Sequence, residues 1–249
     1  MNNSASAAIF ERCRSLAMQV FAGVLSFAAL TLLSTQISAA SAEEWRAIGH
    51  EPSWLLSRAG NEMTLDTDFG ATRVSFAVPP ATRVDDRTVS YATSVNGETL
   101  QLTVTTAVCV DTMTGMPRPE QVLLTLGDRR LQGCGGNPAT LLQGHEWTVA
   151  TLAGTPALAA PRITFTFGDD GRLSGLASCN RFGADYSLTG EGLSVGKGMS
   201  SMMACEPDIM KQEQLFMALL DRVSRFSIDA DGALILHSDR DRTIVTARP

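Results

Sequence analysis

The stretch that decides the fold runs from Gly175 to Cys205 and reads GLASCNRFGADYSLTGEGLSVGKGMSSMMAC. An Asn-Arg-Phe-Gly run follows its first cysteine, Cys179, and a Met-Met-Ala run precedes its second, Cys205. Glycines in such places commonly mark a bulge or a close approach of the backbone, and asparagine tolerates a left-handed backbone. The stretch therefore predicts a tightly turned corner of a β-rich domain.

The same residues resemble the signature of the META domain, the family of the bacterial heat-shock protein HslJ. The resemblance covers about residues 142–247 and keeps the family's order: an opening tryptophan strand, S-G-x-x-x-C-N-R-F, a methionine-rich segment ending in cysteine, a helix and two closing strands. Ser178 departs from it, because many members have glycine before the cysteine. The resemblance implies a stress-associated envelope protein, whose possible binding surface comprises Asn180, Arg181, Phe182, Gly183 and Met202.

The amino terminus has the pattern of a secretory signal. Cationic residues in Glu11–Arg14 precede an apolar run over Val20–Leu33, and Ala40–Ala42 supplies the small residues of a cleavage site. The run is about 14 residues long, whereas a membrane-spanning helix needs roughly 20. We therefore predict a signal peptide over residues 1–42, cleaved before Glu43, and a periplasmic or secreted protein. No stable membrane span is expected after cleavage, and no cysteine stands just after the apolar run, where a lipoprotein would need one.

The charge of the chain limits the kinds of partner that we expect, and its cysteine content indicates the compartment. Cleavage would leave 18 basic and 25 acidic residues, a net charge of −7, which gives no attraction for nucleic acid. Four cysteines would remain, and an even number in an exported chain favours disulfides, with three possible pairings. Sequence order favours Cys109 with Cys134 and Cys179 with Cys205, because each pair then falls within one predicted domain.

The first predicted domain, residues 43–138, consists of short strands. Residues 88–95 and 98–105 flank Asn96-Gly97, a dipeptide typical of a type I′ hairpin turn. Three motifs, Gly49–Trp54, Cys109–Gly115 and Gly133–Gly136, together resemble an uncharacterised family of bacterial envelope proteins over about residues 45–136. That resemblance implies a small β-barrel-like unit and no activity.

Within this domain, His50, Glu51 and Asp111 could form an acid/base or metal-binding group. No second histidine lies at ligand spacing. We therefore interpret residues 50–52 as a bend before a strand and residues 111–115 as a turn after Cys109. No metal, cofactor or catalytic residue is predicted.

The second predicted domain, residues 142–249, is an antiparallel sheet packed by one amphipathic helix. Residues 162–168 alternate most strongly between apolar and polar side chains, and a turn at residues 169–171 leads back into a paired strand. Apolar residues at helical spacing predict a helix over about residues 207–226, which Pro207 opens. Strands over 233–237 and 243–247 finish the domain. The whole chain is thus predicted to be mainly β, of the α+β class, with two small domains.

The expected function is that of a non-enzymatic envelope protein that binds or scaffolds a protein or small molecule. Two alternatives remain open. One is an inhibitor of an enzyme that attacks the envelope, since small exported β proteins can insert a loop into a target's cleft. The other is thiol–disulfide chemistry at Cys179 and Cys205, although redox proteins usually carry a C-x-x-C pair.

Overall fold

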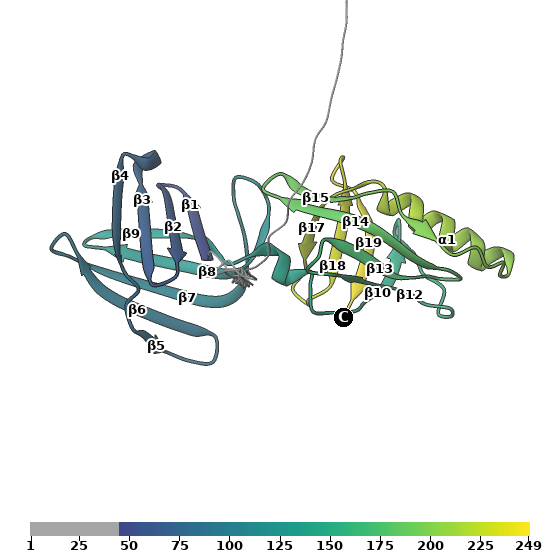
Figure 1. Cartoon of the computed structure of the whole chain (residues 1–249), viewed down its shortest axis with the longest axis horizontal. Coiled ribbons are helices and arrows are strands. Elements are labelled where there is room, and N and C mark those ends of the chain that lie inside the picture. Colours follow the sequence, from purple (N-terminus) through teal and green to yellow (C-terminus); the bar gives the residue numbers. More distant parts are fainter. Residues whose placement is uncertain (1–44) are drawn as a thin grey trace, which may run out of the picture. The chain divides into compact units, whose positions relative to one another are not determined.

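A computed structural model describes residues 45–249 of the protein. The predicted signal peptide and its cleavage point lie outside the described residues. Within them, the strands form two antiparallel sheets, accompanied by one α-helix (Figure 1). This confirms the mainly β fold with one packing helix. From residue 45 onward, each helix is too short or too polar to cross a membrane.

The first sheet has nine strands in the order β4-β3-β2-β1-β9-β8-β7-β6-β5. Their bounds are β1 (Trp45–His50), β2 (Ser53–Ala59), β3 (Glu62–Thr67), β4 (Thr72–Ala77), β5 (Ala81–Arg83), β6 (Thr88–Val95), β7 (Glu98–Val110), β8 (Pro117–Leu126) and β9 (Arg129–Gly135), with a short 3-10 turn, η1 (Asp68–Gly70), between β3 and β4.

This sheet curls around a single apolar core. Leu56 and Leu65 from one half share the core with Leu100, Leu102 and Leu124 from the other half. The sheet is open, because β4 and β5 remain its two edges, and the barrel-like unit that the resemblance implied stays a prediction. The predicted hairpin is confirmed, because β6 and β7 pair from Val95 and Glu98 outward, and both turn residues have positive φ.

Trp54 explains the glycines in the motifs of the first sheet. Its indole is buried, and its Nε1 donates a hydrogen bond of 3.1 Å to the carbonyl oxygen of Gln132. A Cβ atom on Gly49 or Gly133 would overlap this indole, and on Gly133 it would also overlap the carbonyl oxygen of Ile48. Glycine is therefore required at both positions for β1 and β9 to pass beneath the tryptophan.

The second sheet has the strand order β15-β14-β13-β12-β10-β19-β18-β17, with β11 paired to β10 and β16 to β14. Its elements are β10 (Trp147–Leu152), β11 (Thr155–Pro156), β12 (Ile163–Phe167), β13 (Arg172–Ala177), β14 (Arg181–Thr189), β15 (Gly192–Val195), β16 (Met199–Ser200), β17 (Val223–Ile228), β18 (Leu234–Ser238) and β19 (Thr243–Arg248). A 3-10 turn, η2 (Pro138–Leu141), lies between the two sheets in sequence. The division into domains at residues 138 and 142 falls at this turn and stays a prediction.

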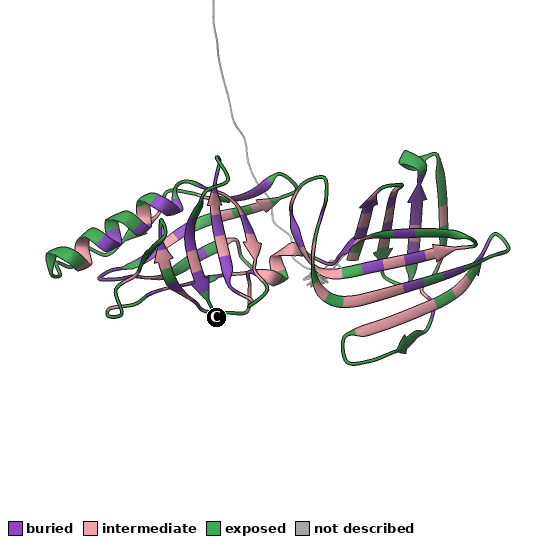
Figure 2. Cartoon of the chain, turned by 180° about the vertical axis from the view of Figure 1, so that it is seen from behind, coloured by how far each residue is buried: buried purple, intermediate pink, exposed green. Residues whose placement is uncertain are grey.

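The helix α1 (Pro207–Leu220) packs on the second sheet through Phe216. The ring of Phe216 stacks on Phe165 at a centroid distance of 6.1 Å and meets Phe182 edge-on at 5.4 Å. Figure 2 shows buried and exposed residues alternating along the helix, as expected for a helix with one apolar face. The proline at its first turn is confirmed.

The predicted helix end was wrong. The helix stops at Leu220, and Val223–Ile228 forms strand β17. A register shift between Val223 and Arg225 interrupts the two-residue alternation of this strand, so that its buried residues, Val223 and Phe226, lie three apart. Three-residue spacing is also that of a helix face, which explains the error. The corner predicted over the signature is also shorter than expected. It comprises only residues 178–180, and strand β14 follows it directly.

We predict that Gly133→Ala destabilises the protein by about 2 kcal/mol, a typical cost of overpacking a filled site. The added methyl group must displace the Trp54 ring or the Ile48 carbonyl group. The free energy of unfolding in urea measures the effect. Gly190→Ala is the matched control, because nothing lies within 4 Å of its Cβ position. Equal stability of the two variants would contradict the role assigned to Gly133.

Candidate functional site

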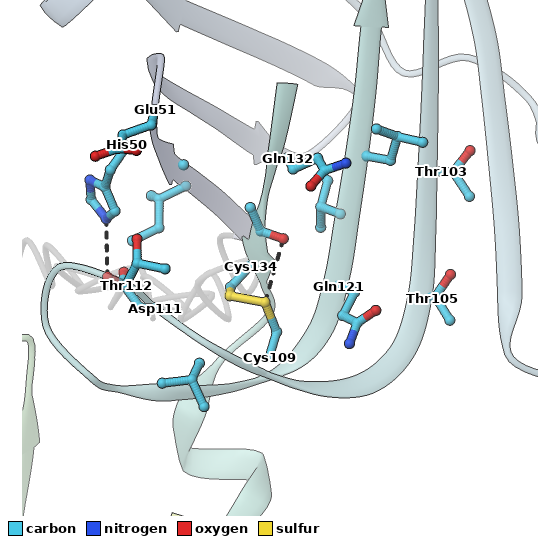
Figure 3. Close-up of a pocket in the computed structure, with 16 residues that line it drawn as sticks. His50, Glu51, Thr103, Thr105, Cys109, Asp111, Thr112, Gln121, Gln132 and Cys134 are labelled. Carbon is cyan, nitrogen blue, oxygen red and sulfur yellow. Dashed lines mark hydrogen bonds and ion pairs between the residues drawn. A yellow bond between two sulfur atoms is a disulfide. The ribbon is translucent and has the colours of Figure 1, made fainter. Parts of the chain in front are cut away.

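A pocket of about 520 Å³ lies in the first sheet, on the face opposite its core (Figure 3). Strand register places Thr105, Gln121 and Cys134 in one row across β7, β8 and β9, and Ile48 of β1 continues this row. The neighbouring row comprises Thr103, Leu123 and Gln132. The alternation of strand residues between two faces thus builds a floor that mixes hydroxyl, amide and apolar groups.

A disulfide and a loop form the other side of the pocket. Strand β7 carries a bulge between Thr106 and Cys109, and Cys109 is bonded to Cys134 of β9. The loop that follows brings Asp111 and Thr112 to the pocket. The cysteine pairing predicted from the sequence is confirmed for this disulfide and for the one between Cys179 and Cys205.

His50 and Asp111 meet at this loop. Nε2 of His50 lies 3.0 Å from Oδ1 of Asp111, and the same oxygen accepts hydrogen bonds from the amides of Met113 and Thr114. Burial by itself raises the pKa of Asp111, whose residue is 3% exposed, but the bonds from the two amides and from His50 together lower that pKa below its ordinary value. Asp111 therefore remains a carboxylate and holds the loop in its turn.

The turn predicted at residues 111–115 is confirmed, whereas the grouping of His50 with Asp111, which the sequence raised and the structural interpretation set aside, is present as a direct contact. The two residues are 61 positions apart and belong to different motifs. Glu51, which the sequence grouped with them, is exposed and also lines the pocket. Nothing in the periodicity of either segment signals the contact, since it arises from the pairing of β1 with β9 and from the disulfide. Over the described residues 45–249, no group of three or more His, Cys, Asp and Glu side chains is arranged to hold a metal ion.

Asp111 also has a buried oxygen without a hydrogen-bond partner among the described residues, Oδ2. Arg118 carries a second such atom, Nε, while its Nη1 donates a 2.8 Å bond to the carbonyl oxygen of Gly136. Burial lowers the pKa of Arg118, and the charge of Asp111 opposes this effect. The charge of Asp111 thus offsets part of the cost of burying the guanidinium of Arg118.

The asparagine of the META-like signature has a structural role inside the domain. Asn180 is buried, and both of its side-chain polar atoms are occupied. Its Nδ2 donates to Oε1 of Glu213 at 2.9 Å and to the Met203 carbonyl oxygen at 3.2 Å, while its Oδ1 accepts from Ser201 Oγ and from the Met203 amide. Asn180 is therefore a structural cross-link between the corner and the segment leading to Cys205.

Glu213 completes this cross-link from the helix. It is 6% exposed, and its Oε2 accepts the backbone amides of Cys179 at 3.1 Å and Asn180 at 2.7 Å. Ser178 has a φ of 106°, and its hydroxyl oxygen accepts a hydrogen bond of 3.0 Å from Nε2 of Gln212. The corner therefore depends on two consecutive polar residues of α1.

Of the predicted binding surface, only Arg181 and Met202 are exposed. Phe182 is buried against Phe216, and Gly183 pairs with Met199 within the sheet. Asn180 is enclosed as described above. Three of the five residues of the predicted binding surface thus serve the packing of the domain.

Glu213→Gln is expected to destabilise the protein by about 2 kcal/mol, because the amide replaces one of two buried acceptor oxygens by a donor that faces other donors. Denaturant unfolding measures this loss. Glu191→Gln, in an exposed turn, is the matched control and should leave stability unchanged. A similar result for both variants would show that the carboxylate of Glu213 does not hold the corner.

Asp111→Asn should reduce stability by about 1.5–3 kcal/mol near neutral pH, the range for hydrogen bonds to charged groups. Because the folded pKa of Asp111 is lowered from 3.8, its carboxylate stabilises the fold above about pH 4, and this contribution is lost as the pH falls through the folded pKa. The stability difference between wild type and variant should therefore shrink in acid. Asp128→Asn, on an exposed turn, is the control; a pH-independent difference for Asp111→Asn would contradict the linkage.

Comparison with known proteins identifies a family for the part of the chain that forms the second sheet. An NMR structure of a protein from Burkholderia xenovorans is similar to this chain at 27% identity, covering 45% of this chain and 88% of that one with a TM-score of 0.37. A second NMR structure is 21% identical, with coverage of 45% and 94% and a TM-score of 0.37. No curated protein matches the chain. The family model for the META domain matches residues 140–249, which confirms the resemblance inferred from the signature. Residues 140–249 of this chain are a META domain.

Proposed function

We propose that the chain is an exported, non-enzymatic envelope protein that binds a neutral saccharide of one or two rings in the pocket of its first sheet. The observation that carries the proposal is the pocket itself. Its volume of about 520 Å³ falls within the range of small-molecule sites, about 300–1,000 Å³. The META domain adds the association with envelope stress that its resemblance to HslJ implies.

The lining favours an uncharged, hydroxyl-rich ligand. Gln121, Gln132, Thr103 and Thr105 offer amide and hydroxyl groups on three neighbouring strands, so that donors and acceptors alternate over a short distance (Figure 3). Apolar atoms of Leu123 and neighbouring residues lie between them and suit the C–H face of a sugar ring. None of the residues that line the pocket is lysine or arginine, which argues against phosphate or carboxylate ligands.

The same lining supports binding over catalysis. It contains no serine hydroxyl, and its two cysteines are joined to each other. Oδ1 of Asp111 also accepts bonds from the two loop amides, so the contact with His50 forms part of a structural turn. The pair therefore serves to shape the wall, and Thr112 beside it offers another hydroxyl group to a ligand.

Export is supported by the leader pattern at residues 1–42 and by the two disulfides, which persist in oxidising compartments. In the disulfide of the META domain, Cys179 is buried and Cys205 is exposed. This arrangement fits a link that fastens the start of α1 to the corner. The proposal accordingly assigns both disulfides a structural role.

Titration of the folded chain with neutral disaccharides, including N-acetylated ones, tests the proposal by NMR. Chemical-shift changes are expected at Thr103, Thr105, Gln121 and Gln132. Gln132→Ala should weaken binding about tenfold, the equivalent of about 1.4 kcal/mol. Gln101→Ala, on β7 but outside the pocket lining, is the matched control and should bind normally.

Two outcomes would reject this function. Neutral saccharides that leave all four pocket residues unshifted would rule out the ligand class. Capture of an envelope-attacking enzyme, with inhibition that persists in Gln132→Ala, would favour the inhibitor alternative.

A further inference from the structure

Three methionines of the META domain are exposed to an unusual degree. The exposed fractions are 77% for Met199, 98% for Met202 and 55% for Met203. Their thioethers occur within five residues of sequence, just before Cys205. Large apolar side chains grouped on a surface generally indicate a role beyond packing.

The backbone beneath these side chains is firmly held. Met199 and Ser200 form β16, which pairs with β14. The Ser201 amide donates to the Arg181 carbonyl oxygen at 3.0 Å, and the Met203 amide donates to Oδ1 of Asn180 at 2.7 Å. The thioethers are thus presented to solvent by an ordered segment, and their exposure requires no unfolding.

The cysteines of the described residues are not available for oxidation. All four described cysteines are in disulfides, so residues 45–249 offer no free thiol to an oxidant. Thioether sulfur is then the reduced sulfur that remains, and two-electron oxidants convert it to sulfoxide where they can reach it. Met63 and Met116, at 2% and 7% exposure, are shielded.

We infer that Met199, Met202 and Met203 form a reversible oxidation site for hypochlorous acid or a peroxide. With a peroxide, the thioether sulfur donates an electron pair to an oxygen atom and forms the sulfur–oxygen bond while the O–O bond breaks. With hypochlorous acid, sulfur takes the chlorine as the O–Cl bond breaks, and water then displaces chloride and supplies the oxygen. Sulfur loses two electrons. Hypochlorous acid is thereby reduced to chloride with release of a proton, and hydrogen peroxide is reduced to water.

The location of the site explains how the fold survives this chemistry. A sulfoxide is polar and disrupts a hydrophobic core, but these three sulfur atoms belong to exposed side chains. The segment is held through backbone groups, Asn180 and the Cys179–Cys205 disulfide, none of which contains a thioether. The face therefore changes from apolar to polar while the domain beneath it stays folded. This inference is independent of saccharide binding in the first sheet.

Stepwise oxidation of the folded chain with hypochlorous acid tests the inference. Peptide mass spectrometry should find sulfoxide at the three positions on the order of tenfold faster than at Met63 and Met116. Met113, which is 71% exposed in the loop after β7, is the control for a single exposed methionine and should also react. Near-ultraviolet circular dichroism should not change. Methionine sulfoxide reductases of types A and B, with a reductant, should then restore the original mass.

A leucine triple variant, Met199→Leu, Met202→Leu and Met203→Leu, keeps similar apolar volume but removes the three thioethers. It should take up three fewer equivalents of oxidant than wild type and unfold at the same denaturant concentration, whereas Met113→Leu should take up one fewer. Sulfoxide at Met113 with the three positions still reduced would overturn the inference. Loss of the near-ultraviolet signal on their oxidation, or sulfoxides that the reductases cannot repair, would do the same.

Discussion

The META domain depends on the buried contact between Asn180 and Glu213. One carboxylate accepts two backbone amides of the corner and the side-chain amide of Asn180, which in turn binds both the amide and the carbonyl group of Met203. Three segments that are distant in sequence are thereby joined: the corner, the methionine-rich segment and the helix. Each polar atom in the group is satisfied by another, which is the condition for burying so many of them.

The disulfide between Cys179 and Cys205 acts on the same three segments. It fixes the corner to the residue two positions before α1, while Phe216 packs the helix against Phe165 and Phe182. Hydrogen bonds define the geometry, apolar contacts supply burial, and the covalent link limits the freedom of the unfolded chain. With its backbone fastened in this way, the methionine-rich segment can expose its side chains without becoming disordered.

The first sheet solves a different problem, because it must curl tightly and still leave a pocket on its outer face. Trp54 occupies the space that side chains at Gly49 and Gly133 would fill, which brings β1 and β9 close together on the core side. On the other face, the bulge in β7 and the Cys109–Cys134 disulfide raise a loop beside the strands. The pocket results from this loop and from the polar residues that alternate with core residues along β7 and β8.

The sequence by itself determined the mainly β class with one helix and several local elements, but not strand β17. Alternating apolar residues predicted β12, and Asn96-Gly97 predicted the hairpin between β6 and β7. Pro207 predicted the start of α1, and the order of the cysteines predicted both disulfides. Each of these signals lies within a short stretch of sequence. Only the tertiary structure decided that Asn180 faces Glu213, that His50 reaches Asp111, and that α1 ends before Val223. These outcomes depend on strand register and on contacts between residues far apart in sequence. Their polar side chains carry no periodic signal, and a bulged strand has the apolar spacing of a helix.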